Sequence, residues 1–169
     1  MRYVALLRAV NVGGTGALPM AGLRALCIEV GFERVETYIA SGNVVFESEA
    51  APSTAKAALE GRLLAHAGKP ICVVMRSAAE IAAVVAGNPF VDVAPKLVHA
   101  IFLDAPPPRN ALERAVGRND ELLRLGEREI FVCYPNGMGR SRLKIPAAAT
   151  GTARNMNTVA RLAEIAAGR

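Results

Sequence analysis

The sequence predicts an α+β fold that opens with a ferredoxin-like βαββαβ unit over residues 1–76. Three observations predict this fold: an almost continuously apolar run at residues 2–10, apolar residues at helical spacing between residues 19 and 30, and two short β-rich runs separated by a glycine-containing turn. Such a unit forms an antiparallel sheet of strand order 4-1-3-2 with two helices on one face. Residues 77–169 predict a second, partly similar α+β subdomain that packs with the first as one compact body.

Local patterns define the elements of the first unit. The run at residues 2–10 is apolar on both faces, which is typical of a central strand, and it ends at the turn-forming residues 11–14. Pro19 lies near the start of the first helix and Gly31 follows its end. The remaining elements are strands over residues 34–39 and 43–46, a helix over residues 52–64, and a strand over residues 71–75.

The second half has a less regular pattern. Its expected elements are a helix over residues 77–86, a strand over 97–103, a helix over 109–116, a hairpin of residues 121–125 with 129–134, and a final helix from about Asn155. The order βαββα therefore recurs, although no residue-by-residue repeat is visible. Internal duplication of the first half is a hypothesis that this order suggests.

Composition limits the class of protein. Apolar residues make up 52% of the 169 residues, but charged residues interrupt every candidate membrane span. Arg8 also interrupts the opening apolar run, which argues against a signal sequence. The 3 cysteines, Cys27, Cys72 and Cys133, lack paired spacing and lie in apolar segments, so we expect buried free thiols. These features predict a protein of the cytoplasm with no membrane partner.

The net charge of +5 is compatible with a polyanionic partner. However, the basic set contains 16 Arg and only 4 Lys in an alanine-rich chain, a bias that genome composition alone can produce. Tyr3 and Phe46 are the only aromatic residues on the central predicted strands, whereas RNA binding by such a sheet uses several stacked aromatic rings. Nucleic acid is therefore a weakly supported partner.

Polar residues gather at one predicted edge of the first sheet. In a βαββαβ unit, the end of the first strand, the turn between the second and third strands, and the junction before the fourth strand share an edge. That edge collects Arg8, Asn11, Gly13, Gly14, Ser41, Gly42, Asn43 and Lys69. Backbone N–H groups and an arginine could bind an anion there. The alternative is that Asn and Gly are simply the residues that tight turns require.

A second polar cluster precedes the final helix. It contains Arg154, Asn155 and Asn157, and a basic glycine-containing loop at residues 135–144 could close over a ligand. The two arginine-and-asparagine sets could be halves of one anion site, because the planar guanidinium group holds two phosphate oxygens. We therefore predict one ligand-binding pocket lined by Arg8, Asn11, Gly13, Gly14, Ser41, Asn43, Arg154, Asn155 and Asn157. The alternative is that both sets are separate structural caps.

Motifs for catalysis and for cofactors are absent from the sequence. It has neither the GxGxxG nor the Walker A pattern, and Ser41 lacks the GxSxG context of a hydrolase nucleophile. The 2 histidines, His66 and His99, have no partners at metal-ligand spacing. We therefore expect no metal and no cofactor, and the sequence identifies no catalytic residue.

Four segments carry a resemblance to a known family: residues 8–14, 38–44, 88–90 and 154–158. They resemble the signatures of the uncharacterised bacterial proteins grouped as domain of unknown function family 1697. The resemblance covers essentially the whole chain and implies an α+β body with two ferredoxin-like parts, without an established activity. The chain departs from the family pattern at Ala9, Ala40 and Met156, where the family usually has Gly, Gln and Trp, so contacts by that Gln or Trp are not carried over.

The expected function is binding of a phosphate-bearing small molecule or nucleotide at the polar, basic rim. One alternative is an enzyme, a transferase or hydrolase acting on such a ligand. Another is a homo-oligomeric scaffold or a nucleic-acid-binding protein. The sequence does not indicate an oligomeric state.

Overall fold

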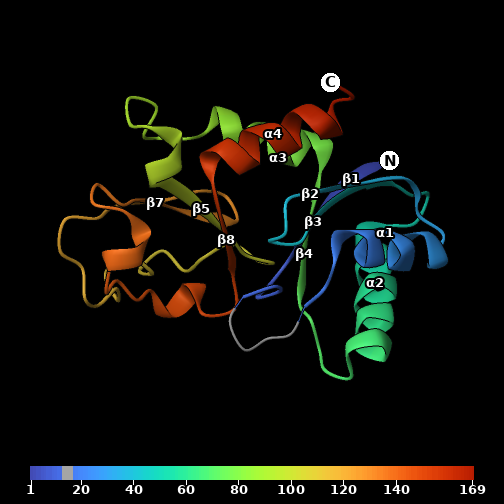
Figure 1. The fold of residues 1–169 in the computed structure, drawn as a ribbon. Coiled ribbons are helices and arrows are strands. Elements are labelled where there is room, and N and C mark those ends of the chain that lie inside the picture. Colours follow the sequence, from blue (N-terminus) through green and yellow to red (C-terminus); the bar gives the residue numbers. More distant parts are fainter. Residues whose placement is uncertain (13–16) are drawn as a thin grey trace. The chain divides into compact units, whose positions relative to one another are not determined.

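The computed structural model describes residues 1–12 and 17–169, and these contain two antiparallel four-stranded sheets (Figure 1). The chain divides into two compact units: unit 1 comprises residues 1–81 and 162–169, and unit 2 comprises residues 82–161. The predicted subdomains, residues 1–76 and 77–169, differ from these units at the C-terminus, where residues 162–169 group with unit 1.

Unit 1 has the predicted order of strands and helices. Its elements are β1 (Arg2–Leu7), α1 (Met20–Glu29), β2 (Glu33–Tyr38), β3 (Asn43–Glu47), α2 (Pro52–Ala67) and β4 (Val73–Ser77). All neighbouring strands are antiparallel, and the sheet order is β2-β3-β1-β4. This confirms the predicted βαββαβ order, the central position of β1 and the strand order 4-1-3-2.

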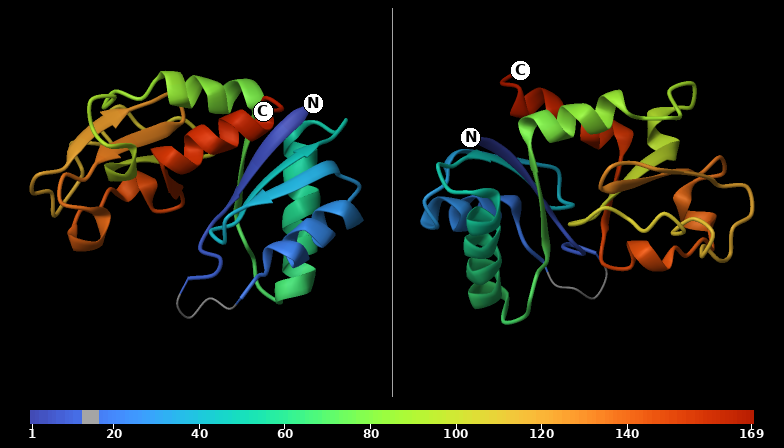
Figure 2. Two further views of the ribbon diagram at one scale, coloured as in Figure 1. Left: turned by 45° about the horizontal axis from the view of Figure 1, so that its top comes forward. Right: turned by 180° about the vertical axis from the view of Figure 1, so that it is seen from behind.

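The core of unit 1 lies between its sheet and the helices α1 and α2, which cover the same face (Figure 2). Alternate residues of β1, namely Tyr3, Ala5 and Leu7, point into this core because successive side chains of a strand face opposite ways. Phe32 stacks on Phe46 with ring centroids 3.9 Å apart. Regular alternation and helical spacing explain why this unit was predictable from sequence.

Strand β1 ends at Leu7, three residues earlier than predicted, because the backbone turns away at a left-handed Ala9 (φ 54°). The turn between β2 and β3 packs against this end, where the Leu7 N–H donates to the Gly42 carbonyl at 2.8 Å. Gly42 has φ 89°, and a Cβ there would lie 2.5 Å from Val10 Cγ2 and 2.9 Å from Leu7 Cβ. Only glycine fits this approach.

Unit 2 has the same sheet topology as unit 1. Its strands are β5 (Val98–Phe102), β6 (Leu122–Leu125), β7 (Glu129–Cys133) and β8 (Thr152–Asn155). Their order is β6-β7-β5-β8. If the strands of each unit are numbered along the chain, both sheets therefore have the order 2-3-1-4. Short 3-10 helices at Pro95–Leu97, Met138–Arg140 and Pro146–Ala148 complete the unit. The order that recurs in the sequence therefore corresponds to a repeated strand topology.

Two helices cross the boundaries between the units. Helix α3 (Ala78–Ala86) contains the boundary after Ile81, and α4 (Met156–Ala166) contains the boundary before Leu162. Both were predicted, with starts within two residues of those observed. Each follows the last strand of a sheet, so the helices occupy equivalent places in the two repeats.

Two expectations for the second half are wrong. Residues 109–116 do not form a helix: residues 109–114 form turns, in which the Ala111 N–H donates to the Pro108 carbonyl, and Val116 forms a β-bridge with Lys144. Prolines before this segment and Gly117 after it leave too few residues for a stable helix. Strand β8 was not predicted, because its polar residues suggested a loop before the final helix.

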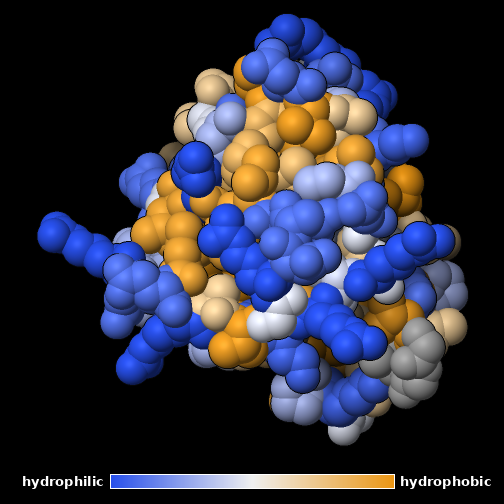
Figure 3. Space-filling view, turned by 90° about the vertical axis from the view of Figure 1, so that its left-hand side faces the viewer, coloured by the Kyte–Doolittle hydropathy of each residue, from blue (hydrophilic) through white to orange (hydrophobic). Residues whose placement is uncertain are grey.

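The described part of the chain has no helix that is both long and apolar enough to cross a membrane. Figure 3 shows one face of the molecule, on which apolar residues adjoin long hydrophilic side chains. Large apolar side chains that are exposed include Val91, Val116 and Met138. Single exposed apolar residues are common on folded proteins and need no partner to explain them.

We predict that Gly42→Ala lowers the free energy of unfolding by about 2–4 kcal/mol, because the added methyl group meets Val10 and Leu7 in a left-handed backbone. The control is Gly61→Ala, in the middle of α2 with open space around it, which should raise the free energy of unfolding by about 0.5–1 kcal/mol. Urea denaturation followed by circular dichroism measures both. Equal effects of the two changes would contradict the close approach.

Candidate functional site

Asn11 lies at the predicted rim, where its side chain forms hydrogen bonds with two loops. Its side-chain amide donates to the Leu18 carbonyl at 2.8 Å and to the Ala40 carbonyl at 2.7 Å, and its oxygen accepts the Leu18 N–H. Its backbone is left-handed, with φ 55°. Since both amide hydrogens and the oxygen are used within the protein, Asn11 serves the loop structure.

Asn43 has a similar structural role in the turn between β2 and β3. It is fully buried, and its amide donates to the Tyr38 carbonyl and to Ser41 Oγ, both at 2.9 Å. Arg8 is exposed at the end of β1, where its N–H donates to the Cys72 carbonyl at 3.0 Å. The predicted Gly13 and Gly14 lie outside the described residues.

Two of the three connections predicted at this edge, the end of β1 and the junction between α2 and β4, line one cavity. A cavity of about 200 Å³ is lined by residues from the end of β1, from the approach to α1 and from the junction between α2 and β4. Its polar contributors are His66 and the predicted Lys69, and Val10, Leu18 and Ile71 supply apolar walls. None of the predicted ligand-binding residues that the structure describes lines this cavity.

Arg154, in the second predicted cluster, lies in strand β8. Its side chain is 7% exposed and donates to Thr152 Oγ1 at 2.8 Å and to the Ala153 carbonyl at 3.0 Å. Burial lowers the pKa of Arg154 to about 10. Asn155 caps α4, because its oxygen accepts the Thr158 N–H at 3.0 Å, whereas Asn157 is exposed. That these residues share a pocket with the rim stays a prediction.

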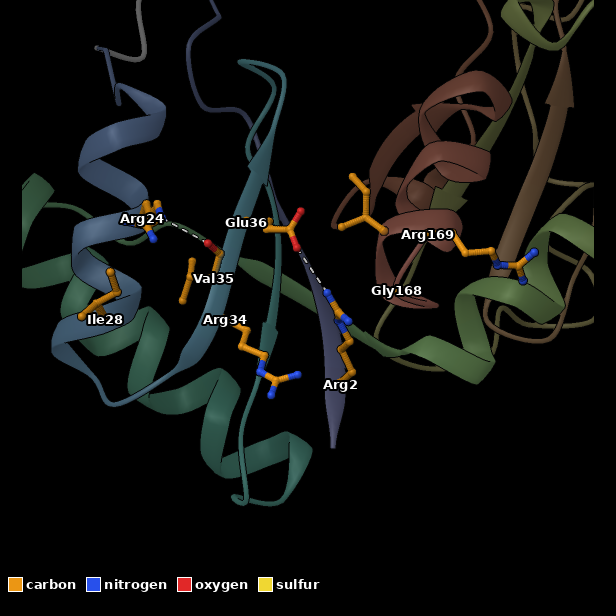
Figure 4. Close-up of a pocket in the computed structure, with 9 residues that line it drawn as sticks. Arg2, Arg24, Ile28, Arg34, Val35, Glu36, Gly168 and Arg169 are labelled. Carbon is orange, nitrogen blue, oxygen red and sulfur yellow. Dashed lines mark hydrogen bonds and ion pairs between the residues drawn. The ribbon is translucent and has the colours of Figure 1, made fainter.

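Another polar hollow of unit 1 lies along β2. A cavity of about 490 Å³ is lined by Arg2 from β1, Arg24 and Ile28 from α1, and Arg34 and Glu36 from β2 (Figure 4). Arg169 also lines it, but Figure 4 shows its side chain directed away from Arg2 and Glu36. Three arginines from three elements therefore remain as candidates for one anion.

Strand β2 is bulged at this cavity. The pairing register with β3 shifts between Glu33 and Glu36, and Arg34 has a left-handed backbone with φ 48°. Arg24 stabilises the bulge, because its Nε–H donates to the Val35 carbonyl at 3.1 Å. A left-handed arginine in a strand costs about 1–2 kcal/mol, and bulges commonly re-aim a side chain near a functional site.

The ion pairs at this cavity are long and exposed to solvent. Arg2 Nη2 lies 3.3 Å from Glu36 Oε1, and Arg34 Nη1 lies 3.5 Å from Glu47 Oε1, compared with about 2.7–2.9 Å for a strong charge-assisted hydrogen bond. The Glu36 side chain is 56% exposed and that of Arg34 is 73% exposed. Arg2 Nε is buried and has no hydrogen-bond partner among residues 1–12 and 17–169. The arginines therefore retain donors for a ligand.

Sequence reasoning missed this cavity because no motif links Arg2, Arg24 and Arg34. Arg2 and Glu36 lie on different strands that are separated by β3, and only the strand order brings them together. The register shift that turns Arg34 is also invisible in a single sequence. The only available signal was the predicted strand order, which places residues near 2 and 34 at the same end of the sheet.

The three thiols differ in exposure. Cys27 and Cys133 are buried as predicted, whereas Cys72 is exposed, because it lies just before β4 rather than in it. Burial raises the pKa of Cys27 to about 12, and burial together with the charge of Asp120 raises the pKa of Cys133. Among residues 1–12 and 17–169, no group of three or more His, Cys, Asp or Glu side chains could hold a metal ion.

Comparison with known proteins supports the resemblance seen in the sequence. Residues 1–131 match the model of the family described as "Protein of unknown function (DUF1697)". The chain belongs to this family. No curated protein matches the chain.

One solved structure similar to this chain is that of the conserved bacterial protein SP0830 from Streptococcus pneumoniae. The two are 25% identical, each chain is covered to 98%, and the TM-score is 0.80. The left-handed backbone at Ala9 is one that glycine adopts without strain, so the Gly that the resemblance implies at this position fits the structure.

We predict that Asn155→Ala lowers the free energy of unfolding by about 1 kcal/mol, because it removes the side-chain acceptor at the start of α4. The matched control is Asn157→Ala, in the first turn of α4 and exposed, which should change it by less than about 0.5 kcal/mol. Chemical denaturation measures both. If Asn157→Ala were the more harmful change, the capping role of Asn155 would be wrong.

We also predict that Ellman's reagent at pH 8 titrates one thiol, Cys72, in the folded protein and all 3 in denaturant. The thiolate is the reactive form, and raised pKa values keep Cys27 and Cys133 protonated at this pH. Cys72→Ser should abolish the reaction of the folded protein. Fast reaction of a second thiol under native conditions would refute the assignment.

Proposed function

We propose that the chain binds a phosphate-bearing small molecule or nucleotide, with Arg2, Arg24 and Arg34 as the anion-binding residues. The observation that carries the proposal is the bulge in β2, which holds Arg34 in a strained left-handed backbone at the wall of the cavity. Strain of this kind persists only where surrounding contacts impose it, here through Arg24 and Val35.

Arginine chemistry supports a phosphate as the ligand. A guanidinium group presents planar, paired N–H donors that match two oxygens of one phosphate. In the part of the chain that the structure describes, the buried Nε–H of Arg2 has no acceptor, and the ion pair between Arg2 and Glu36 is long. A phosphate dianion offers more charge and more acceptors than either exposed glutamate, so it could displace the carboxylates from Arg2 and Arg34.

The cavity favours a small molecule over a nucleic acid. Its volume of about 490 Å³ lies within the range of about 300–1,000 Å³ that is usual for small-ligand sites. Ile28, Val35 and Ile165 supply the apolar lining, and no aromatic ring lines the cavity among the residues described. Single-stranded nucleic acids bind mainly by stacking on aromatic rings.

Other expectations from the sequence remain proposals beside this one. The predicted rim at Arg8 is an alternative place for the anion, although Asn11 and Asn43 there are used within the fold. An enzyme acting on the ligand and a homo-oligomeric scaffold are alternative functions. A cytoplasmic location and a ferredoxin-like classification of unit 1 also remain predictions.

We predict that Arg34→Ala weakens binding of pyrophosphate or ATP about 10-fold or more, because each charged hydrogen bond lost contributes about 1.5–3 kcal/mol. Isothermal titration at fixed ionic strength measures the affinity, with melting curves as a check of folding. Two arginine controls should leave binding unchanged: Arg62→Ala, whose partner is Glu29 at 2.6 Å, and Arg8→Ala at the rim.

The controls also separate the two candidate places for the anion. If affinity survives Arg34→Ala and Arg2→Ala but falls with Arg8→Ala, the ligand binds at the predicted rim and the cavity assignment is wrong. If neither pyrophosphate nor ATP binds at millimolar concentration, the proposed function itself fails.

A further inference from the structure

Unit 2 contains a second polar cavity, separate from the one assigned above. Its volume is about 410 Å³, and it lies between the segment before β6 and the segment after β7. Every residue that lines it belongs to unit 2. The central polar groups are Glu121, Tyr134 and Ser141.

Glu121 is a buried carboxylate at this cavity, with 3% of its surface exposed. One oxygen accepts the Ser141 hydroxyl, and the other accepts the Asn119 N–H at 2.7 Å. These hydrogen bonds, led by the one from Ser141, hold the pKa of Glu121 below its usual value, so the group is ionised at neutral pH. An ionised carboxylate has about four acceptor sites, so it can accept further donors.

Tyr134 lines the same cavity and is 8% exposed. Its ring meets His99 edge to face, with centroids 5.2 Å apart. Burial and the charge of Glu121 raise the pKa of Tyr134, so its phenol is protonated at neutral pH. Among the described residues, no hydrogen bond joins the Tyr134 hydroxyl to another group. The hydroxyl therefore has a hydrogen that it can donate to a ligand in the cavity.

A hydroxyl group is the ligand chemistry that fits these two side chains together. It can donate its hydrogen to Glu121 and accept the hydrogen of Tyr134 with its oxygen. An ammonium group has no acceptor for the tyrosine, and an anion has no donor for the glutamate, which would also repel it. The pair therefore favours an alcohol over an ammonium group or an anion.

The same cavity also has basic side chains in its lining. Arg140 and Arg142 line the cavity, are exposed, and form no ion pair or hydrogen bond through their guanidinium groups within the described part of the chain. Asp120 and Asn136, which are hydrogen-bonded to each other, add further acceptors and donors for hydroxyl groups. The combination matches a molecule that carries hydroxyls and one anionic group.

The loop that carries the arginines is held in place. The Val116 and Lys144 backbones exchange two hydrogen bonds, at 2.9 and 2.8 Å. Gly117 has φ 71°, and a Cβ there would lie 2.2 Å from the Arg142 carbonyl, so the two segments touch through their backbones. Ser141 Oγ also accepts the Leu143 N–H at 3.1 Å. A fixed loop binds a ligand without a large ordering cost.

We propose that this cavity of unit 2 binds a sugar phosphate, with sugar hydroxyls at Glu121 and Tyr134 and the phosphate at Arg140 and Arg142. The site goes beyond the anion cavity of unit 1, since it recognises the polyol as well as the charge. The sugar phosphate is a free metabolite or the ribose phosphate of a nucleotide, which share this chemistry.

Isothermal titration of the full chain carrying Arg34→Ala, which weakens the anion site proposed in unit 1, with ribose 5-phosphate, glucose 6-phosphate and AMP tests the proposal and separates the two sources. Ribose and inorganic phosphate serve as the two fragments of the ligand. At least one sugar phosphate should bind more than 10-fold tighter than either fragment. Tyr134→Phe should weaken that binding about 3- to 10-fold, because it removes one hydroxyl hydrogen bond. Replacement of both Arg140 and Arg142 by Ala should reduce the affinity to that of ribose.

Three results would overturn the proposal. They are no binding of any sugar phosphate at 10 mM, equal binding of inorganic phosphate, and full affinity in the folded Tyr134→Phe variant. If that variant fails to fold, Asn136→Ala at an exposed position provides the same test. Arg34→Ala in unit 1 should leave sugar phosphate binding in unit 2 unchanged. The unit 2 proposal can therefore hold even if the anion site of unit 1 is wrong. If Arg34→Ala alone abolishes sugar phosphate binding, the unit 2 site is wrong.

Discussion

The contact between the end of β1 and the β2–β3 turn is the constraint on which the rest of unit 1 depends. β1 pairs with both β3 and β4, so its direction sets the whole sheet. Gly42 allows the turn to approach Leu7 and Val10 without a side chain between them. Asn11 then joins the same turn to the segment that enters α1. Four hydrogen bonds, together with the close approach that Gly42 allows, thus connect the sheet to the segment that enters its first helix.

Unit 1 was predictable because its signals are local and agree with one another. The strand and helix periods, Pro19 and the glycine after α1 all indicate the same order of elements. The second unit was harder to predict because its connections are mostly short turns and 3-10 helices, whose formation depends on tertiary contacts. In β8, the buried Arg154 looks like a loop residue in sequence, and only its pairing with Ala100 of β5 reveals a strand.

Site prediction had a similar limit. Asn11 and Asn43 of the predicted rim use their amides inside the fold, which an isolated sequence cannot show. The arginine cavity depends on a register shift and on strands that are not adjacent in sequence. The Glu121 and Tyr134 pair likewise comes from segments before and after one hairpin. The types of residue therefore indicated where polar groups gather, but the sequence could not indicate which group each side chain bonds to.

Unit 1 is formed by two separate stretches of the chain, and this has a consequence for folding on the ribosome. Residues 162–169 group with residues 1–81, and the whole of unit 2 is encoded between them. At about 5–20 residues per second, these intervening residues delay the last segment of unit 1 by roughly 4–16 s. During that interval the sheet of β1 to β4 exists without Ile165 and its neighbours. The nascent first sheet must therefore persist, or be protected by a chaperone, until the chain returns to it.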